Sequence, residues 1–270
     1  MEKRVSVSIS EGVADVRLVR ADKMNALDAA MFDALVATSD GLAREKDVRV
    51  VVLSGEGRAF CAGLDMGRFA AMKEKGGNGI AGGDKRDLAA RTHGLANFPQ
   101  QAVWGWRQLP VPVIAAIQGV AFGGGFQLAL GADMRFLSPD ARMSIMEIKW
   151  GLVPDMAGTP ILASLLRDDV MRELTYTGRI FSAQEALTYG LATRICDDPR
   201  ATAFEVARDI ASKSPDAIRA AKRMLNNLSV DPGPALLAES VEQMKLMGSA
   251  NQLEAVRANL EKRAPRFSEV

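Results

Sequence analysis

Three consecutive glycines, Gly123, Gly124 and Gly125, lie between an apolar strand-like run and an apolar helix-like run. Glycine has no Cβ, so a ligand can approach the backbone closely at such a position. The first N–H groups of a helix have no partner within the helix and carry a partial positive charge. The pattern therefore predicts a place where backbone N–H groups hold a negatively charged oxygen.

A second small-residue turn, residues 59–66, also follows an apolar strand-like run and contains Gly63 and Leu64. By itself this turn is a weak signal. Two N–H groups, each placed after a strand of a parallel sheet, can converge on one carbonyl oxygen. Such a pair would stabilise an enolate or a tetrahedral oxyanion, and one donor of this kind contributes roughly 3 kcal/mol.

Two carboxyl residues beyond the triple glycine are candidates for proton transfer. Glu147 is flanked by methionine and isoleucine residues. Burial among them would raise its pKa toward the range that general acid-base catalysis requires. The alternative is a structural ion pair of Glu147 with Lys149 or Arg142.

Asp155 is the second carboxyl candidate, eight residues after Glu147. On an uninterrupted helix the two side chains would be about 12 Å apart. Gly151 and Pro154 disfavour such a helix, so a bend can bring both carboxylates to one substrate. The alternative role for Asp155 is a helix cap.

The elements that must position these groups follow from the hydrophobic pattern. Residues 5–18 alternate between apolar and polar around a turn, which predicts an antiparallel hairpin. Residues 26–42 have helical spacing, with Asn25 as the expected cap. The apolar runs 48–53 and 111–117 predict buried strands, and the order strand, helix, strand implies parallel crossover connections.

Two other regions stand apart from this pattern. Residues 66–101 include a polar, glycine-rich stretch that either covers the site or is a surface insertion. Beyond residue 198 the pattern is almost entirely helical, broken near Gly248. We therefore divide the chain into a core of residues 1–198 and a C-terminal helical region of residues 199–270. This helical region either folds back on the core or packs between subunits.

Composition argues against several classes of partner. The 270 residues carry 34 basic and 33 acidic side chains, so neither nucleic acid nor an anionic membrane is expected as a partner. Cys61 and Cys196 are too few for a disulfide framework, and no residue cluster has metal-ligand spacing, so no metal is expected. Without a signal peptide or a membrane span in the sequence, the expected location is cytoplasmic.

Several residues with chemical potential have simpler interpretations. His93, the only histidine, suits a surface or pocket-rim position better than catalysis. Trp104, Trp106 and Trp150 can line a pocket for an apolar ligand, although buried packing is the simpler expectation. Asp65 is interpreted as a turn or cap residue.

Three motifs in order resemble the signatures of the crotonase (enoyl-CoA hydratase/isomerase) superfamily: residues 20–27, 54–65 and 119–125. The tail at residues 260–267 also resembles that of the family. The resemblance implies an α/β fold, a spiral of repeated β-β-α turns with a C-terminal helical trimerisation region, and hence a homotrimer or a dimer of trimers. It also implies an acyl-CoA substrate and no separate cofactor, because coenzyme A is part of that substrate.

The resemblance further assigns site residues. The two oxyanion-hole N–H groups map to Leu64 and Gly124. Substrate-binding positions along the coenzyme A cleft map to Lys23, Ala26, Leu27, Ala62 and Lys262. Lys262 corresponds to a cation near the coenzyme A phosphates, and its alternative is a solvated lysine on a charged terminal helix.

The acid-base residues depart from the hydratase pattern. Hydratases that resemble this chain carry a glutamate where it has Gln127, whose amide can orient water or substrate but cannot exchange a proton. Glu147 matches their second glutamate, and Asp155 resembles the second carboxylate of dienoyl-CoA isomerases. An aspartate at position 155 also resembles the nucleophile of the dehalogenating branch of the family, but that branch has tryptophan at the Glu147 position, which argues against it here. The resemblance therefore favours an enoyl- or dienoyl-CoA isomerase. A hydratase that uses Glu147 and an oriented water, and a catalytically silent CoA-binding scaffold, are the alternatives.

Overall fold

The computed structural model describes residues 3–67, 87–213, 215–226, 232–263 and 265. Most of the glycine-rich stretch within residues 66–101 lies outside these residues, so its expected role as a cover over the site stays a prediction.

The main sheet has six strands in the order β1-β2-β3-β4-β6-β9. They are β1 (Val5–Ser10), β2 (Val13–Leu18), β3 (Val50–Gly55), β4 (Val113–Ile117), β6 (Met134–Leu137) and β9 (Arg194–Ile195). The first two strands form the expected antiparallel hairpin, and every other neighbouring pair is parallel. The carboxyl ends of β3 and β4 therefore lie at the same edge of the sheet. The Gly63 turn follows β3, and the triple glycine follows the short strand β5 (Val120–Phe122), whose Ala121 forms a parallel bridge with Cys61.

Strand β3 is buried on both faces, as its continuous apolar run predicts. Val51 and Leu53 belong to the main core, whereas Val50 and Val52 pack with alanines of helix α8 (Pro199–Ala211) on the opposite face. The pleat sends alternate side chains to opposite faces, so a strand between two helical layers needs apolar residues at every position.

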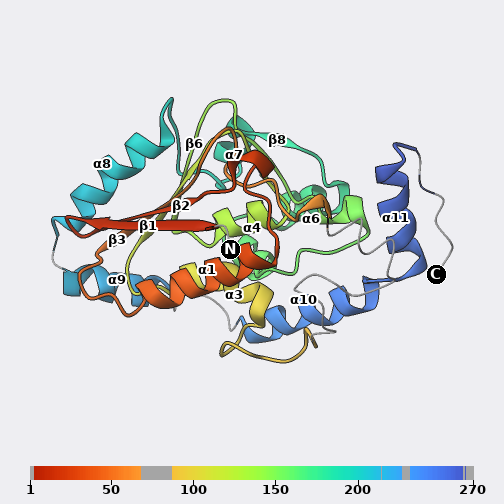
Figure 1. Ribbon diagram of the computed structural model, residues 1–270, viewed down its shortest axis with the longest axis horizontal. Coiled ribbons are helices and arrows are strands. Elements are labelled where there is room, and N and C mark those ends of the chain that lie inside the picture. The colour runs from red at the N-terminus through yellow and green to blue at the C-terminus, as the bar shows by residue number, and fades with distance from the viewer. Residues whose placement is uncertain (1–2, 68–86, 214, 227–231, 264, 266–270) are drawn as a thin grey trace.

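The opposite side of the sheet is covered by α1 (Ala29–Leu42), α3 (Phe98–Gln108) and α4 (Gly124–Leu130). Figure 1 shows α8 on one side of strands β1 to β3 and α1 on the other. The expected helix over residues 26–42 is present but begins later, and its cap is Asp28, whose side chain accepts from Met31 N–H at 2.8 Å.

The prediction that Asn25 caps this helix was wrong. Asn25 adopts a left-handed backbone with φ of +55°, a conformation that asparagine tolerates better than most residues. Its side chain accepts from Arg20 N–H and donates to Glu56 O and Ala59 O. Asn25 therefore joins the segment that begins at Arg20 to residues 56–59, which lead into the Gly63 turn.

A second, three-stranded sheet contains β5 (Val120–Phe122), β7 (Arg142–Ser144) and β8 (Phe181–Ser182). The shorter helices of the core are η1 (Ala21–Lys23), η2 (Glu147–Trp150), α5 (Gly158–Leu162), α6 (Asp168–Thr177) and α7 (Ala183–Thr188). Ser182 caps α7 with a capping box.

The chain continues through α9 (Pro215–Asn226), α10 (Gly233–Leu246) and α11 (Ala250–Leu260), and the last two are separated at Gly248 as expected. In Figure 1, α10 and α11 lie at the opposite end of the molecule from α8 and α9. The division of the chain at residue 198 stays a prediction.

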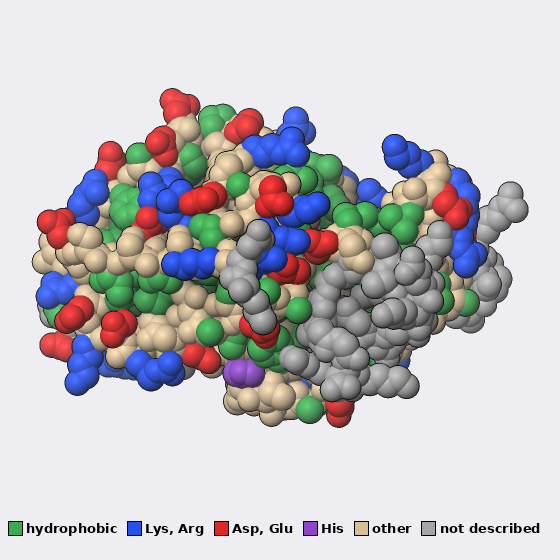
Figure 2. Space-filling model, viewed as in Figure 1, with side chains coloured by type: hydrophobic (Ala, Val, Ile, Leu, Met, Phe, Trp, Pro, Cys, Tyr) green, Lys and Arg blue, Asp and Glu red, His purple; other side chains and the backbone are tan. Residues whose placement is uncertain are grey.

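The helices and the surface charge bear on whether membranes or anionic ligands are partners. None of the helices in the described ranges combines the length and the apolar composition needed to cross a bilayer. On the face in Figure 2, acidic and basic side chains are interspersed over the described surface. Because the formal net charge is only +1, attraction of an anionic ligand depends on local groups.

Candidate active site

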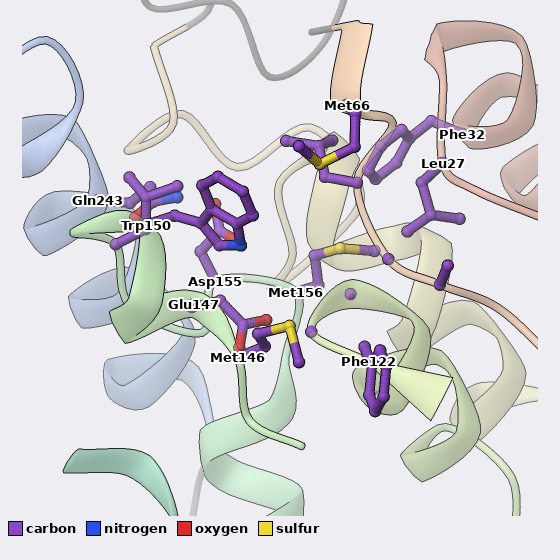
Figure 3. Close-up of a pocket in the computed structure, with 16 residues that line it drawn as sticks. Leu27, Phe32, Met66, Phe122, Met146, Glu147, Trp150, Asp155, Met156 and Gln243 are labelled. Carbon is purple, nitrogen blue, oxygen red and sulfur yellow. The ribbon is translucent and has the colours of Figure 1, made fainter. Parts of the chain in front are cut away.

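One cavity brings together both glycine turns and both candidate carboxyl groups (Figure 3). Its lining consists of Leu27, Phe32, Ala62, Gly63, Leu64, Met66, Phe122, Gly123, Gly124, Met146, Glu147, Trp150, Leu152, Asp155, Met156 and Gln243. Among these lining residues the only ionisable groups are two carboxyl groups, and the rest of the wall is mostly apolar. A negative charge that develops in this cavity must therefore be stabilised by neutral donors.

The first neutral donor is the N–H of Leu64. Gly63 O accepts from Leu27 N–H at 2.8 Å, and this bond sets the plane of the peptide between Gly63 and Leu64. In a trans peptide the N–H points away from the C=O, so Leu64 N–H is directed away from Leu27. No hydrogen bond from Leu64 N–H to another described residue is found.

The second neutral donor is the N–H of Gly124, the first residue of α4. Gly123 O accepts from Gln127 N–H at 3.0 Å, so the N–H of the peptide between Gly123 and Gly124 points out of the helix. The two donors come from touching turns, since a Cβ placed on Gly63 would lie 3.7 Å from Gly124 N.

Close packing explains why this turn is built from glycine. A Cβ on Gly124 would lie 2.8 Å from Leu27 Cδ1 and 2.9 Å from Met156 Sδ. A Cβ on Gly125 would collide with the backbone oxygen of Cys61. The triple glycine therefore serves to bring the two turns together, in addition to leaving backbone donors accessible.

Glu147 lies opposite these donors at the start of η2. Its side chain is buried, the residue being 9% exposed, and a Cβ on Gly123 would lie 3.4 Å from its Oε1. Burial raises the pKa of Glu147 to about 7, although the Gln127 amide opposes the increase. Oε1 accepts from Gln127, whereas Oε2 has no hydrogen-bond partner in the described part of the chain. The alternative role of Glu147, a structural ion pair with Lys149 or Arg142, is therefore not found among these residues.

Gln127 lies behind Glu147 and does not border the cavity. Its Nε2 donates to Glu147 Oε1 at 2.7 Å, while its Oε1 accepts from Met156 N–H at 2.9 Å and Gly158 N–H at 3.0 Å. These partners determine which end of the amide is the donor. Gln127 thus holds Glu147 and the loop after Asp155 in one arrangement.

Asp155 borders the same cavity and is 6% exposed. The expected bend is present, because η2 ends at Gly151 with φ of +68° and α5 begins only at Gly158. The capping residue of α5 is Ala157, so Asp155 does not have the alternative role of a cap. Figure 3 shows Asp155 beside Trp150 and Glu147 beside Met146, both on one wall of the cavity.

The remaining sequence-predicted residues are divided between the cavity and its surroundings. Leu27 and Ala62 border the cavity, whereas Lys23, Ala26 and Lys262 do not. Lys23 and Lys262 are exposed, so their expected contacts with coenzyme A stay predictions.

Trp150 borders the cavity, whereas Trp106 is buried in the main core and Trp104 packs against that core. His93 is half-buried and does not border the cavity.

Gln243 is a cavity residue that the sequence did not predict. It belongs to α10, is buried, and its Oε1 accepts from Val153 N–H at 3.3 Å. A single polar residue on a helix does not indicate a site whose other residues lie more than 80 positions earlier in the chain. The sequence offered only the expectation that the helical tail could fold back on the core.

Replacing Gln127 with glutamate is expected to couple two titrations. The new carboxylate would lie beside Glu147 Oε1, where the amide now donates at 2.7 Å, and two such groups cannot both ionise readily. We expect an apparent pKa above the value of about 7 for Glu147, and a loss of roughly 1–3 kcal/mol of unfolding free energy at pH 8.

Denaturant unfolding at several pH values measures this effect, with Gln184→Glu as the control because Gln184 is an exposed residue of α7. Identical pH dependence in the two variants would contradict the close approach of Gln127 to Glu147.

Comparison of the sequence and the structure with known proteins shows which family the chain belongs to. The family model described as enoyl-CoA hydratase/isomerase matches residues 8–270. The mitochondrial Delta(3,5)-Delta(2,4)-dienoyl-CoA isomerase of Mus musculus is 32% identical over 95% of this chain and 79% of its own length. Carnitinyl-CoA dehydratase of Proteus mirabilis is 32% identical over 99% of each chain.

The crystal structure of an enoyl-CoA hydratase/isomerase from Pseudoalteromonas atlantica is similar to the structure of this chain, with a TM-score of 0.83 and 27% sequence identity over 98% of this chain and 100% of the other. The expected crotonase-like α/β fold is thereby confirmed, as is an enzyme family whose members are lyases or isomerases. The chain belongs to the enoyl-CoA hydratase/isomerase family.

Proposed function

We propose that the protein is an enoyl- or dienoyl-CoA isomerase that stabilises a thioester enolate with the N–H groups of Leu64 and Gly124. The observation that carries this proposal is the position of Glu147, whose buried carboxyl group faces the Gly123 turn and has an oxygen without a hydrogen-bond partner among the described residues. A carboxyl group with a pKa of about 7 can both accept and return a proton near neutral pH.

In the proposed reaction, ionised Glu147 removes a proton from Cα of an unsaturated thioester. Electrons move onto the thioester oxygen, which accepts from the two backbone N–H groups. The carboxyl group of Asp155 acts as the second acid: it delivers a proton to the far end of the conjugated system, and the double bonds shift toward the thioester. Glu147 gains one proton and Asp155 loses one, and exchange with solvent restores both.

The neutral side chain of Gln127 favours isomerisation over hydration. Its amide is held by three hydrogen bonds and cannot act as an acid or base. Hydration by Glu147 and an oriented water is the second candidate, supported by relatives named as a dehydratase and a hydratase. A relative named as a dienoyl-CoA isomerase supports the first.

The other parts of the proposal follow from family membership. The substrate is an acyl-CoA, with coenzyme A held along Lys23, Ala26, Leu27, Ala62 and Lys262, and no separate cofactor takes part. A homotrimer or a dimer of trimers completes this part of the proposal. A cytoplasmic location is proposed on the sequence pattern alone and not on family membership, since the relatives include a mitochondrial enzyme.

Incubation with a panel of 3-enoyl-, 3,5-dienoyl- and 2-enoyl-CoAs in deuterated water, followed by mass spectrometry, tests the reaction. We expect deuterium incorporation and double-bond migration. Water addition to crotonyl-CoA at a rate unaffected by Glu147→Gln would contradict the role of Glu147, and silence across all chain lengths would favour a CoA-binding scaffold.

Replacing Asp155 with asparagine is expected to separate the two proton transfers. The variant should keep deuterium exchange at Cα, because Glu147 is intact, but should lose roughly 10²-fold or more in double-bond migration because the second acid is missing. Asp169→Asn removes a carboxylate from an exposed ion pair and is the control. Equal loss of exchange and migration would assign Asp155 to a step that both share.

A further inference from the structure

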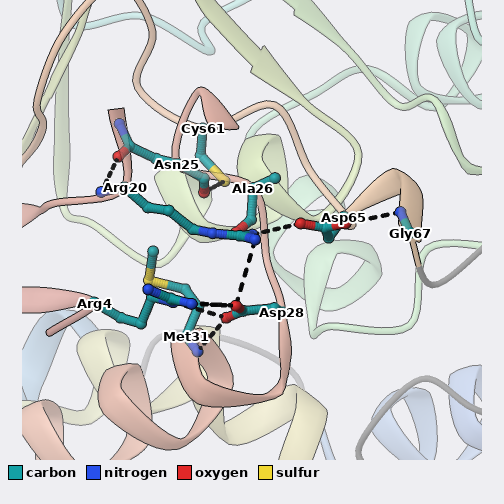
Figure 4. Close-up of polar contacts among 9 residues, drawn as sticks. All are labelled: Arg4, Arg20, Asn25, Ala26, Asp28, Met31, Cys61, Asp65 and Gly67. Carbon is teal, nitrogen blue, oxygen red and sulfur yellow. Dashed lines mark hydrogen bonds and ion pairs between the residues drawn. The ribbon is translucent and has the colours of Figure 1, made fainter. Parts of the chain in front are cut away.

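A partly buried ion pair joins Arg20 to Asp65, the residue that follows Leu64 in the chain (Figure 4). Arg20 Nη1 lies 2.5 Å from Asp65 Oδ2, and the two side chains are 14% and 17% exposed. The other carboxylate oxygen of Asp65 accepts from Gly67 N–H at 2.8 Å, and Asp65 N–H donates to Leu27 O at 3.1 Å. Neither Arg20 nor Asp65 borders the cavity, so any effect on the reaction must act through other groups.

Two peptide groups connect Arg20 with the proposed oxyanion donor. Arg20 Nη1 donates to Ala26 O at 3.0 Å. The N–H of the same peptide group, which belongs to Leu27, donates to Gly63 O at 2.8 Å. The N–H of the next peptide group in this series is that of Leu64. A continuous chain of hydrogen bonds therefore leads from the guanidinium to the donor that would hold the substrate oxygen.

We infer that Arg20 is a positioning residue that aims and polarises Leu64 N–H through these two peptide groups, while Asp65 holds the guanidinium in place. The inference rests on the proposed function, because it requires a thioester oxygen at Leu64. Peptide groups are rigid and planar, so a displacement of Arg20 changes the direction of the terminal N–H. Hydrogen bonds in a chain also polarise one another, and a cation at the head of the chain makes the last N–H a stronger donor.

A second carboxylate, that of Asp28, also holds the Arg20 guanidinium in position. Arg20 Nη2 lies 3.6 Å from Asp28 Oδ2, and Arg4 Nη2 lies 2.8 Å from the same oxygen. The guanidinium of Arg20 thus forms ion pairs with two carboxylates, those of Asp28 and Asp65. A neutral residue at position 20 removes the first donor of the hydrogen-bond chain, the guanidinium that contacts Ala26 O. It also removes an ion-pair partner from both Asp28 and Asp65.

The first test is kinetic. Arg20→Met is expected to lower kcat about 10- to 100-fold, since misplacement by 1 Å can cost about 10²-fold, with KM changed less than about threefold. Arg20→Lys retains the charge and should recover part of the loss, and Asp65→Asn should lower kcat in the same direction. Arg17→Met is the matched control, because it removes a partly exposed ion pair between Arg17 of strand β2 and Glu56.

The second test needs no turnover. The carbonyl stretch of butyryl-CoA, labelled with ¹³C at the thioester carbon, is expected to move to lower frequency on binding to the unmodified protein. In Arg20→Met and Asp65→Asn it should return toward the value of the free thioester, and in Arg17→Met it should not. If Arg20→Met fails to fold in a thermal unfolding assay, Arg20→Lys and Asp65→Asn supply the comparison.

The outcomes separate the inference from the proposed reaction. Unchanged kcat and unchanged carbonyl frequency in the Arg20 and Asp65 variants overturn the inference and leave the reaction standing. If the carbonyl frequency of bound butyryl-CoA is lowered but the unmodified protein converts none of the enoyl-CoAs, the proposed reaction is contradicted. The carbonyl frequencies of the variants then still decide the role of Arg20. Absence of any frequency change in the unmodified protein overturns both.

Discussion

Replacing Glu147 with glutamine is expected to reduce kcat by about 10²- to 10⁴-fold and, at the same time, to stabilise the fold above pH 7. The loss of activity follows because glutamine cannot accept the Cα proton, although it keeps the size of the side chain and can still accept from Gln127 Nε2. The gain in stability follows from burial, which raises the pKa of Glu147 from its ordinary value of 4.5 to about 7.

The direction of the stability effect depends on pH. Below about pH 4.5 the carboxyl group is protonated in both the folded and the unfolded chain, so it contributes no difference. Between pH 4.5 and about 7 the unfolded chain releases the proton while the folded chain retains it, so the unfolding free energy falls as pH rises. Above pH 7 the penalty is constant, at most about 3 kcal/mol, and Glu147→Gln removes it.

Chemical denaturation at pH 4 and pH 8 measures this effect. Because Glu147 borders a cavity that water can enter, we expect a gain of about 1–3 kcal/mol at pH 8 and little change at pH 4. Glu45→Gln, at an exposed position, is the control. A Glu147→Gln variant that is less stable than the parent protein at pH 8 would show that the carboxylate has a stabilising partner in the folded protein.

Periodicity and glycine placement predicted much of the fold, because these signals are local. The hairpin of residues 5–18 and the buried strands β3 and β4 depend on residues close together in the chain. The cap of α1 was missed because Asn25 and Asp28 are both good capping residues. Only the long-range bonds from Asn25 to Glu56 and Ala59 decide between them.

The candidate site was predictable only in part, for a related reason. Glu147 and Asp155 were recognisable from their apolar surroundings and from Gly151 and Pro154, which disfavour a continuous helix. Arg20 was not singled out, because its contact with Asp65 joins residues 45 positions apart. Sequence patterns indicate the type of side chain, but the convergence of separate segments on one peptide group is a property of the folded chain.

The position of Gln127 connects these observations. A glutamine fits here because its amide has both a donor and an acceptor, and the structure uses each: two backbone N–H groups and one carboxylate oxygen. A carboxylate could accept from the N–H groups but would repel Glu147. The neutral residue therefore leaves Glu147 with a single, well-defined titration near neutral pH.

Replacing Gly63 with alanine is expected to reduce kcat by about 10²- to 10³-fold and to lower the unfolding free energy by roughly 2–5 kcal/mol. Gly63 has φ of +86°, which alanine rarely adopts, and its new Cβ would lie 2.5 Å from Phe122 O. Because Phe122 O belongs to the backbone, relief of this clash must separate the Leu64 turn from the Gly123 turn. The two N–H donors would then no longer converge on one oxygen.

Gly94→Ala distinguishes this clash from backbone strain alone. Gly94 has φ of +65°, yet a Cβ there would meet nothing within 4 Å, so the substitution adds strain of about 1–2 kcal/mol without a clash. We expect Gly94→Ala to lower the melting temperature while kcat stays within about twofold, whereas Gly63→Ala should lower both. Equal kcat losses in the two variants would mean that general destabilisation explains the effect. A loss confined to Gly63→Ala would instead indicate that the spacing between the two turns, more than the stability of the fold, determines how well the thioester oxygen is held.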